Sequence, residues 1–165
     1  MITEEKNDKS ASTHAVSERF VEHVKFPKNM GTLAFANASA KVIGSCGDAM
    51  EVQLRIVGKT ICDIKCVPDG CLYTRVCASA MSEQVKGRVI ESALEVDPED
   101  VADALGGLPE DHMHCARLAV NTLAEAVGNY FQQHSYWEEN RLWAARVSGG
   151  QRHPESCCLR FANSN

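Results

Sequence analysis

Long apolar runs, a secretory leader and an excess of basic residues are all missing from this 165-residue sequence. No apolar run approaches the roughly 18 residues of a membrane-spanning helix, so we expect no membrane partner. Residues 1–10 are polar and lack the apolar centre of a signal peptide, which predicts a cytoplasmic location. Acidic side chains outnumber basic ones, 22 against 17, for a net charge of −5. Nucleic acid is therefore not an expected partner, because phosphate binding requires a basic face.

Paired cysteines of the Cys-x-x-Cys type are also missing, although the chain contains 8 cysteines. Their share, about 5% of the residues, lies below the ~8–10% typical of disulfide-rich scaffolds. In a cytoplasmic chain, thiols indicate metal binding or catalysis. Without a Cys-x-x-Cys pair, neither a zinc ribbon nor a thioredoxin-like site is predicted. A Ser-His-Asp hydrolase has no support either, because no nucleophile-elbow motif occurs.

Hydrophobic periodicity predicts an α+β domain: an N-terminal helix, a three-stranded antiparallel sheet, and then helices packed on one face. We expect a disordered arm over residues 1–11, a domain over 12–133, and a C-terminal extension over 134–165 that is partly helical and then disordered. The expected helices cover 12–24, 71–86, 89–94, 97–105 and 111–133, and the expected strands cover 36–42, 50–56 and 60–67.

The clearest β pattern lies in the middle of the chain. Apolar and polar residues alternate from Met50 to Ile56, and Gly58-Lys59 matches a two-residue type II′ hairpin turn. On the return strand we expect Cys62, Ile64 and Cys66 to face the buried side. Cys62 and Cys66 are therefore predicted to be small core residues.

Three other cysteines give no signal of a functional site. Cys77 lies six positions after Cys71, roughly 120° away around a helix, so Cys77 is predicted to be buried rather than a ligand. Cys157 and Cys158 are neighbours in the expected tail, where a disulfide between them would be strained. We assign no role to that pair.

The remaining cysteines, Cys46, Cys71 and Cys115, each lie at a junction between expected elements. Peptide dipoles and free N–H groups at a helix start favour a thiolate, the form that binds metals and attacks sulfur. Asp48 adds a carboxylate and His114 an imidazole beside these cysteines. Spacing alone leaves an ordinary turn at residues 46–48 open, because the intervals between the cysteines match no zinc-finger rule.

A series of short motifs runs from about residue 16 to Tyr130. They are FPKNMG (26–31), CGDAM (46–50), DGC (69–71), KG (86–87), LGGLP (105–109) and HCARLA (114–119). In this order and at these intervals, they resemble the motifs of the NifU/IscU-type iron–sulfur cluster assembly scaffolds.

The resemblance implies a scaffold rather than an enzyme. Such a protein receives persulfide sulfur from a cysteine desulfurase, combines it with iron into a transient 2Fe–2S cluster, and transfers the cluster to apo-proteins. By motif, Cys46, Cys71 and Cys115 would bind the cluster, with Asp48 beside them and His114 as an alternate ligand. Cys115 would also accept the persulfide. The resemblance leaves open a homodimer and zinc in the same site.

Two segments depart from the family pattern, and two other functions remain open. Leu72-Tyr73-Thr74 replaces the usual small residues after the second cysteine, and LPEDH (108–112) replaces the chaperone-binding LPPVK. One alternative is a zinc-dependent persulfide relay of the SufU type, which builds no cluster, although the SufU insertion is missing. The other is a structural zinc module with a closed four-ligand site.

Overall fold

The computed structural model describes the backbone of residues 17–145 and the side chains of residues 17–135. The arm expected over 1–11, the disordered end of the tail and the Cys157–Cys158 pair lie outside the described residues. In chain order the elements are α1 (Glu18–Lys25), β1 (Ala38–Ile43), β2 (Ala49–Val57), β3 (Thr60–Asp69), α2 (Leu72–Val85), α3 (Ile90–Leu94), α4 (Pro98–Ala104), the 3₁₀ turn η1 (Glu110–His112) and α5 (Met113–Ala145).

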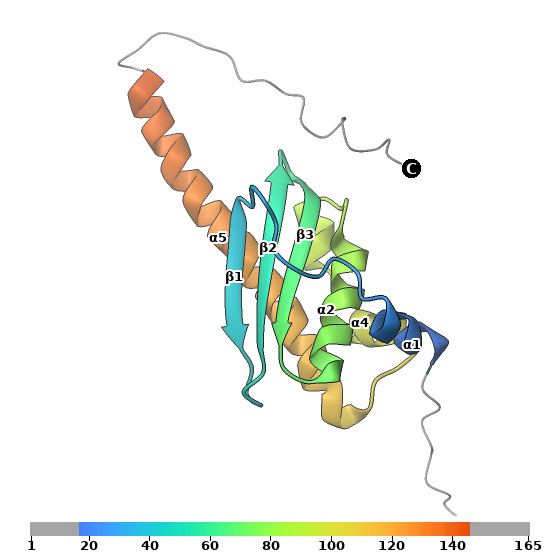
Figure 1. Ribbon diagram of the computed structural model, residues 1–165. Coiled ribbons are helices and arrows are strands. Elements are labelled where there is room, and N and C mark those ends of the chain that lie inside the picture. The colour runs from blue at the N-terminus through green and yellow to red at the C-terminus, as the bar shows by residue number, and fades with distance from the viewer. Residues whose placement is uncertain (1–16, 146–165) are drawn as a thin grey trace, which may run out of the picture.

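A sheet and a pair of helices form the two layers of the domain. The strands are antiparallel in the order β1-β2-β3. Helix α5 contacts β1 and β2, and α2 contacts β3. Figure 1 shows both helices behind the sheet, with the segment that joins α1 to β1 crossing the opposite face. The predicted α+β fold, with helices on one face, is confirmed.

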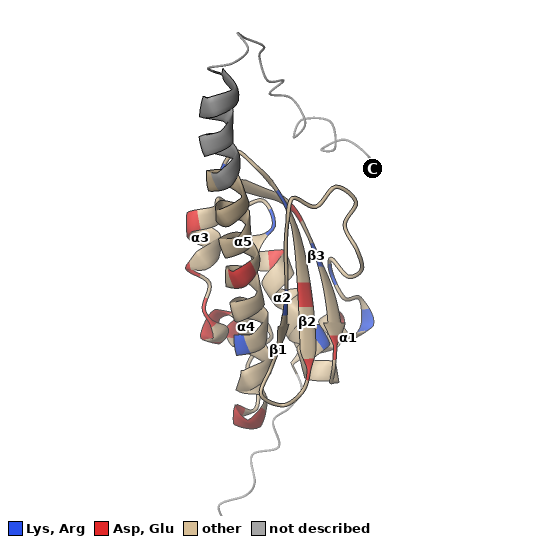
Figure 2. Ribbon diagram, turned by 90° about the vertical axis from the view of Figure 1, so that its left-hand side faces the viewer, with Lys and Arg blue, Asp and Glu red and all other residues tan. Residues whose placement is uncertain are grey.

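The hydrophobic core lies between these two layers. From strand β2, Met50, Val52 and Leu54 are fully buried, and the residues between them are partly exposed, as the alternation predicted. Met81 of α2 and Leu123 of α5 close the core from the helix side. Acidic residues lie along α3 and α4, beside the start of α5 (Figure 2).

Strand β3 departs from the expected alternation at Cys62. Arg55 pairs with Asp63, whereas the next residue of β2, Ile56, pairs with Ile61. This β-bulge inserts Cys62 as an extra residue and reverses the parity of the strand. Ile61 therefore takes the buried position and Cys62 is only partly buried, so the prediction that Cys62 faces the core is wrong. Cys66 lies beyond the bulge and is fully buried, as predicted.

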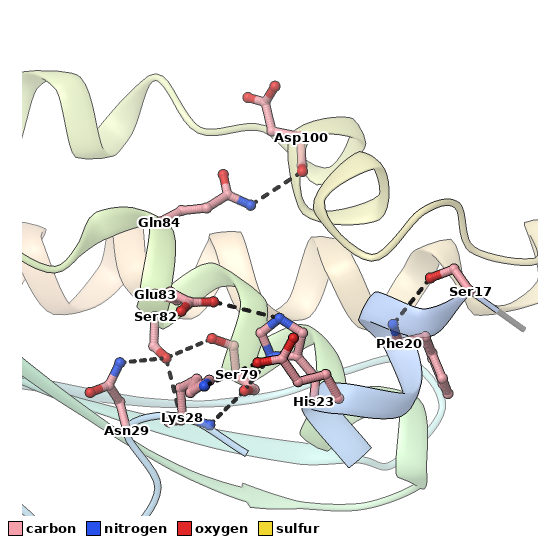
Figure 3. Close-up of polar contacts among 11 residues, drawn as sticks. Ser17, Phe20, His23, Lys28, Asn29, Ser79, Ser82, Glu83, Gln84 and Asp100 are labelled. Carbon is pink, nitrogen blue, oxygen red and sulfur yellow. Dashed lines mark hydrogen bonds and ion pairs between the residues drawn. The ribbon is translucent and has the colours of Figure 1, made fainter. Parts of the chain in front are cut away.

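Helix α1 and the loop after it are fixed on α2 by buried polar contacts (Figure 3). Nδ1 of His23 lies 2.7 Å from Oγ of Ser79, and the backbone N–H of Lys28 donates to the same oxygen at 2.7 Å. Nδ2 of Asn29 donates to Oγ of Ser82 at 3.1 Å. His23, together with Lys28 and Asn29 of the FPKNMG motif, thus holds α1 and the following loop against α2.

Helix boundaries differ from the expected ones at both ends of the described chain. Helix α1 begins at Glu18 rather than at residue 12, because Oγ of Ser17 caps it by accepting from the N–H of Phe20 at 3.1 Å. Helix α5 runs past residue 133 to Ala145, so the helical part of the extension continues this helix. Of the helices in the described part, none combines the length and the apolar character that a membrane crossing requires.

Candidate metal and sulfur site

Three segments that are distant in sequence meet at one end of the domain (Figure 1). They are the loop 44–48 between β1 and β2, the junction of β3 with α2, and the first turn of α5. Cys46 lies in the loop, Cys71 is the N-cap residue of α2, and Cys115 lies near the start of α5. The predicted position of each of these cysteines at an element junction is confirmed.

The sulfur atoms of Cys71 and Cys115 form the centre of this site. Their Sγ atoms are 3.8 Å apart, and Oγ1 of Thr74 lies 3.4 Å from each of them. Cys71 is exposed, whereas Cys115 is completely buried. The pair therefore connects the solvent to the interior, and Thr74, which sequence reasoning did not identify, holds the two thiols together.

The Asp48 carboxylate reaches the sulfur pair from the β1–β2 loop. Its Oδ2 accepts the Thr74 hydroxyl at 2.5 Å and the backbone N–H of Cys71 at 3.1 Å. These hydrogen bonds, that of Thr74 first, lower the pKa of Asp48 below its ordinary value. The contact requires glycine at position 70, because a Cβ atom there would lie 2.4 Å from Cγ of Asp48.

Two histidines lie close to Cys115. Nε2 of His114, the predicted alternate ligand, is 3.4 Å from Sγ of Cys115. His112 was not predicted, but one of its ring nitrogens and the Sγ atoms of Cys71 and Cys115 all lie within 4.8 Å of one another. The three-residue interval from His112 to Cys115 was the available signal, because residues three apart share one side of a helical turn.

Cys46 does not belong to this set of three ligand atoms, and neither do Asp48 and His114. Cys46 is exposed in a tight turn, in which the N–H of Gly47 donates to Gly44 at 3.0 Å and the N–H of Gly44 donates to Asp48 at 2.8 Å. Gly47 has a φ of +88°, in the region that favours glycine. Because Asp48 is bonded to Cys71, this loop brings Cys46 to the same end of the domain.

Burial controls the acid–base chemistry of Cys115. A helix start was expected to favour its thiolate, but burial raises the pKa of Cys115 to about 12. The hydrogen bond with Thr74 opposes this rise, whereas the neighbouring Cys71 and Asp48 add to it. The pKa of Cys115 is therefore shifted in the direction opposite to the expected one. A metal ion bound at the site would replace the proton and hold this sulfur as a thiolate.

The donor set defines the chemistry that this site supports. Two thiols and an imidazole suit zinc, iron and iron–sulfur clusters, and the nearby carboxylate is a harder ligand. These three donor atoms are one fewer than the four ligands of a closed structural zinc site. The arrangement is therefore a candidate site for a soft divalent metal ion.

The fold and this site together define a small α+β domain with a candidate metal site at one end. The family model described as "NifU-like N terminal domain" matches residues 15–136. The chain belongs to this family, and the resemblance inferred from its motifs is confirmed.

Several relatives and solved structures support this assignment. An "Iron-sulfur cluster assembly scaffold protein IscU 1" of Archaeoglobus fulgidus is 36% identical over 118 residues, which cover 71% of this chain and 77% of the relative. A "Nitrogen fixation protein NifU" of Azotobacter chroococcum mcd 1 is 38% identical over 117 residues, which cover 69% of this chain and 38% of the relative. The crystal structure of a NifU-like N-terminal protein from Brucella abortus, 18% identical, has a TM-score of 0.56 over 70% of this chain and 94% of that chain, which shows the shared fold.

Proposed function

We propose that this chain is a scaffold for assembling a labile 2Fe–2S cluster, with iron and persulfide sulfur as its substrates. The sulfur comes from a cysteine desulfurase, and the cluster passes to apo-proteins of the reducing cytoplasm. The observation that carries this proposal is the pair of sulfurs of Cys71 and Cys115, 3.8 Å apart with Asp48 bonded beside them. It is supported by the 36% identity to a relative named as an IscU scaffold.

The ligand roles follow from the chemistry of each side chain. Thiolates of Cys46, Cys71 and Cys115 match iron–sulfur clusters, and a stable electron carrier would use four of them. We assign the fourth position to Asp48, with His114 as an alternate ligand. A carboxylate is a weaker match for this soft chemistry, so Asp48 keeps the cluster releasable.

Sulfur transfer to Cys115 involves no net change of oxidation state. A cation bound at the site would displace the proton of Cys115, and the resulting thiolate would attack the terminal sulfur of the persulfide on the desulfurase. A new S–S bond forms on Cys115, the S–S bond of the donor breaks, and the donor cysteine leaves as a thiolate. The exposed Cys71 thiol, 3.8 Å from Cys115, marks the side from which the donor approaches.

Anaerobic reconstitution tests the proposal. The protein is incubated with ferrous iron, cysteine and a cysteine desulfurase, and we expect visible absorption, protein-bound iron and sulfide, and transfer to an apo-ferredoxin. A Cys46/Cys71/Cys115 triple-serine variant should form no cluster, whereas the control Cys62→Ser, outside the site, should form it normally. Asp48→Ala should lengthen the lifetime of the cluster and slow its transfer. An equal cluster yield in the triple variant would refute the scaffold function.

A zinc-dependent persulfide relay is the second candidate, and the set of Cys71, His112 and Cys115 favours it because these donors also suit zinc. The crystal structure of a putative iron–sulfur cluster assembly scaffold protein for the SUF system, from Fervidobacterium islandicum AW-1, is also similar to this chain. It is 25% identical and has a TM-score of 0.53 over 67% of this chain and 94% of that chain. Retained zinc, persulfide on one cysteine by peptide mass mapping, and no cluster in the same incubation would select the relay.

A further inference from the structure

His112 lies at the point where η1 passes into α5, three residues before Cys115. Its imidazole nitrogen completes the set of three ligand atoms with the sulfurs of Cys71 and Cys115. The position lies in the LPEDH segment, where the family motif has the lysine of LPPVK. A side chain that binds protons and metals thus stands where a permanently cationic one is usual.

The His112 ring is oriented by packing rather than by hydrogen bonding. It stacks on the ring of Tyr73, with centroids 3.6 Å apart and planes 9° from parallel. Tyr73 follows Cys71 by two residues and also packs against Phe20, at a centroid distance of 5.3 Å. Leu72-Tyr73-Thr74, the other segment that departs from the family pattern, therefore supplies the ring against which His112 packs.

One nitrogen of this ring has an unmet requirement. Nδ1 of His112 is buried and has no hydrogen-bond partner within residues 17–135. A buried polar atom without a partner is costly, and a bound ion is one of the explanations for it. His114 differs, because its Nε2 already contacts Sγ of Cys115 at 3.4 Å and it lies outside the set of ligand atoms.

We propose that His112, rather than His114, is the imidazole ligand for a divalent metal ion bound between Cys71 and Cys115, and that Tyr73 positions its ring. The inference rests on the proposed function only in that this ion is a substrate of the same site. Binding to two thiols and a neutral imidazole releases two protons and gives an uncharged centre. A fourth position remains for Asp48, Cys46 or solvent.

Metal binding without any cluster chemistry tests this inference. Zn²⁺ affinity is measured under reducing conditions by competition with a chromophoric chelator, and Co²⁺ supplies d–d and sulfur-to-cobalt absorption bands. We expect His112→Gln to weaken Zn²⁺ binding at least about tenfold and to alter the d–d bands. His114→Gln should weaken binding less than His112→Gln, and the matched control His134→Gln, at an exposed position of α5 outside the site, should stay within about threefold of the wild type. Tyr73→Leu should weaken binding less than His112→Gln, because the ligand remains but its orientation is lost.

A measurement on the wild-type chain avoids variants that fail to fold. Long-range ¹H–¹⁵N spectra of the histidine rings should show a metal-bound nitrogen on His112, and not on His114, when Zn²⁺ is added. Binding that depends on His114, or on neither histidine, would overturn the inference and leave the scaffold proposal intact. Reconstitution of the wild type separates the two, because Zn²⁺ binding through His112 with no cluster formed would refute the proposed function and leave this inference intact.

Discussion

Cys71 and Cys77 are six residues apart in sequence, yet one is exposed at the N-cap of α2 and the other is fully buried, as predicted. Burial raises the pKa of Cys77 far above its ordinary value, and it raises the pKa of Cys66, in the neighbouring strand, to about 12. These two thiols stay protonated and act as small apolar side chains. Depth alone does not separate the proposed ligand cysteines from the packing cysteines, because Cys115 is as buried as Cys77. Cys115 differs in that its Sγ lies against the Sγ of the exposed Cys71.

Asp48, in the candidate site, and Asp63, in strand β3, differ in what stabilises their carboxylates. Burial alone would raise the pKa of Asp63, but Lys86 at 2.9 Å and Arg55 at 3.5 Å outweigh it and lower the pKa. The pKa of Asp48 is also lowered, but by the neutral donors Thr74 and the Cys71 N–H. Asp48 forms no ion pair with a lysine or arginine of residues 17–135. Its negative charge therefore remains available to a metal ion, whereas that of Asp63 is neutralised.

Alkylation is the measurement with the largest expected contrast. Iodoacetamide should modify Cys46 and Cys71 at least about 100-fold faster than Cys66 and Cys77, because a core thiol reacts only when the structure opens. Rates are followed site by site by peptide mass mapping. In denaturant all four should react at similar rates. Equal rates for Cys71 and Cys77 in the folded protein would remove the distinction on which this comparison rests.

The features of the fold that depend on local sequence signals could be predicted, whereas others could not. Alternation in β2 and the start of a helix at Asp97 are local signals, and both were predicted; the structure adds that Asp97 and Asp100 form a capping box. The bulge at Cys62 was missed, because one extra residue leaves the composition of a strand unchanged. The end of α5 was placed too early, at residue 133, although no glycine or proline follows before Ala145 to stop the helix.

In the site, motif residues were predicted and their supporting contacts were not. Cys71, Cys115 and Asp48 carry signals in the sequence, and the structure brings the carboxylate and the two thiols together. His112 carried only its three-residue interval to Cys115 as a signal, and Thr74 becomes recognisable only after packing has placed α2 against the start of α5. Residue type and spacing alone do not report contacts made between distant segments.

Position 70 offers a way to disturb the site without changing a ligand. In Gly70→Ala the new Cβ would meet the Asp48 carboxylate, which must turn away from Thr74 and the Cys71 N–H. The loss of these charge-assisted hydrogen bonds should reduce the free energy of unfolding by about 1–3 kcal/mol and weaken metal binding. Chemical denaturation and Zn²⁺ competition measure the two effects.

Gly128→Ala is the matched control for this prediction, because a Cβ at that helical position meets no atom within 4 Å. It should raise the free energy of unfolding by about 0.5–1 kcal/mol and leave metal affinity unchanged. If Gly70→Ala behaved like Gly128→Ala, the close approach of Asp48 to Cys71 would have no energetic consequence.

The smallest expected effect concerns Asp63, the aspartate of strand β3 that forms ion pairs with Lys86 and Arg55. Because the pKa of Asp63 in the folded chain lies below its ordinary value of 3.8, its stabilising contribution is present above that value and is lost as the pH falls through the folded pKa. Asp63→Asn keeps an acceptor for the N–H of Ile64 but removes the charge. It should cost up to about 1 kcal/mol at pH 7, since Lys86 is partly exposed to solvent, and progressively less in acid.

Salt distinguishes the two aspartates more sharply than acid does. At about 1 M NaCl the Debye length falls to about 3 Å, so the cost of Asp63→Asn should shrink as its attraction to Lys86 and Arg55 is screened. The cost of Asp48→Asn should change less, because hydrogen bonds from the neutral donors Thr74 and the Cys71 N–H lower its pKa most and the attraction to His114 contributes least. Denaturation curves of both variants at low and high salt give the comparison. An equal salt dependence would mean that Asp48 also has a cationic partner, and its charge would then not be available to a metal ion.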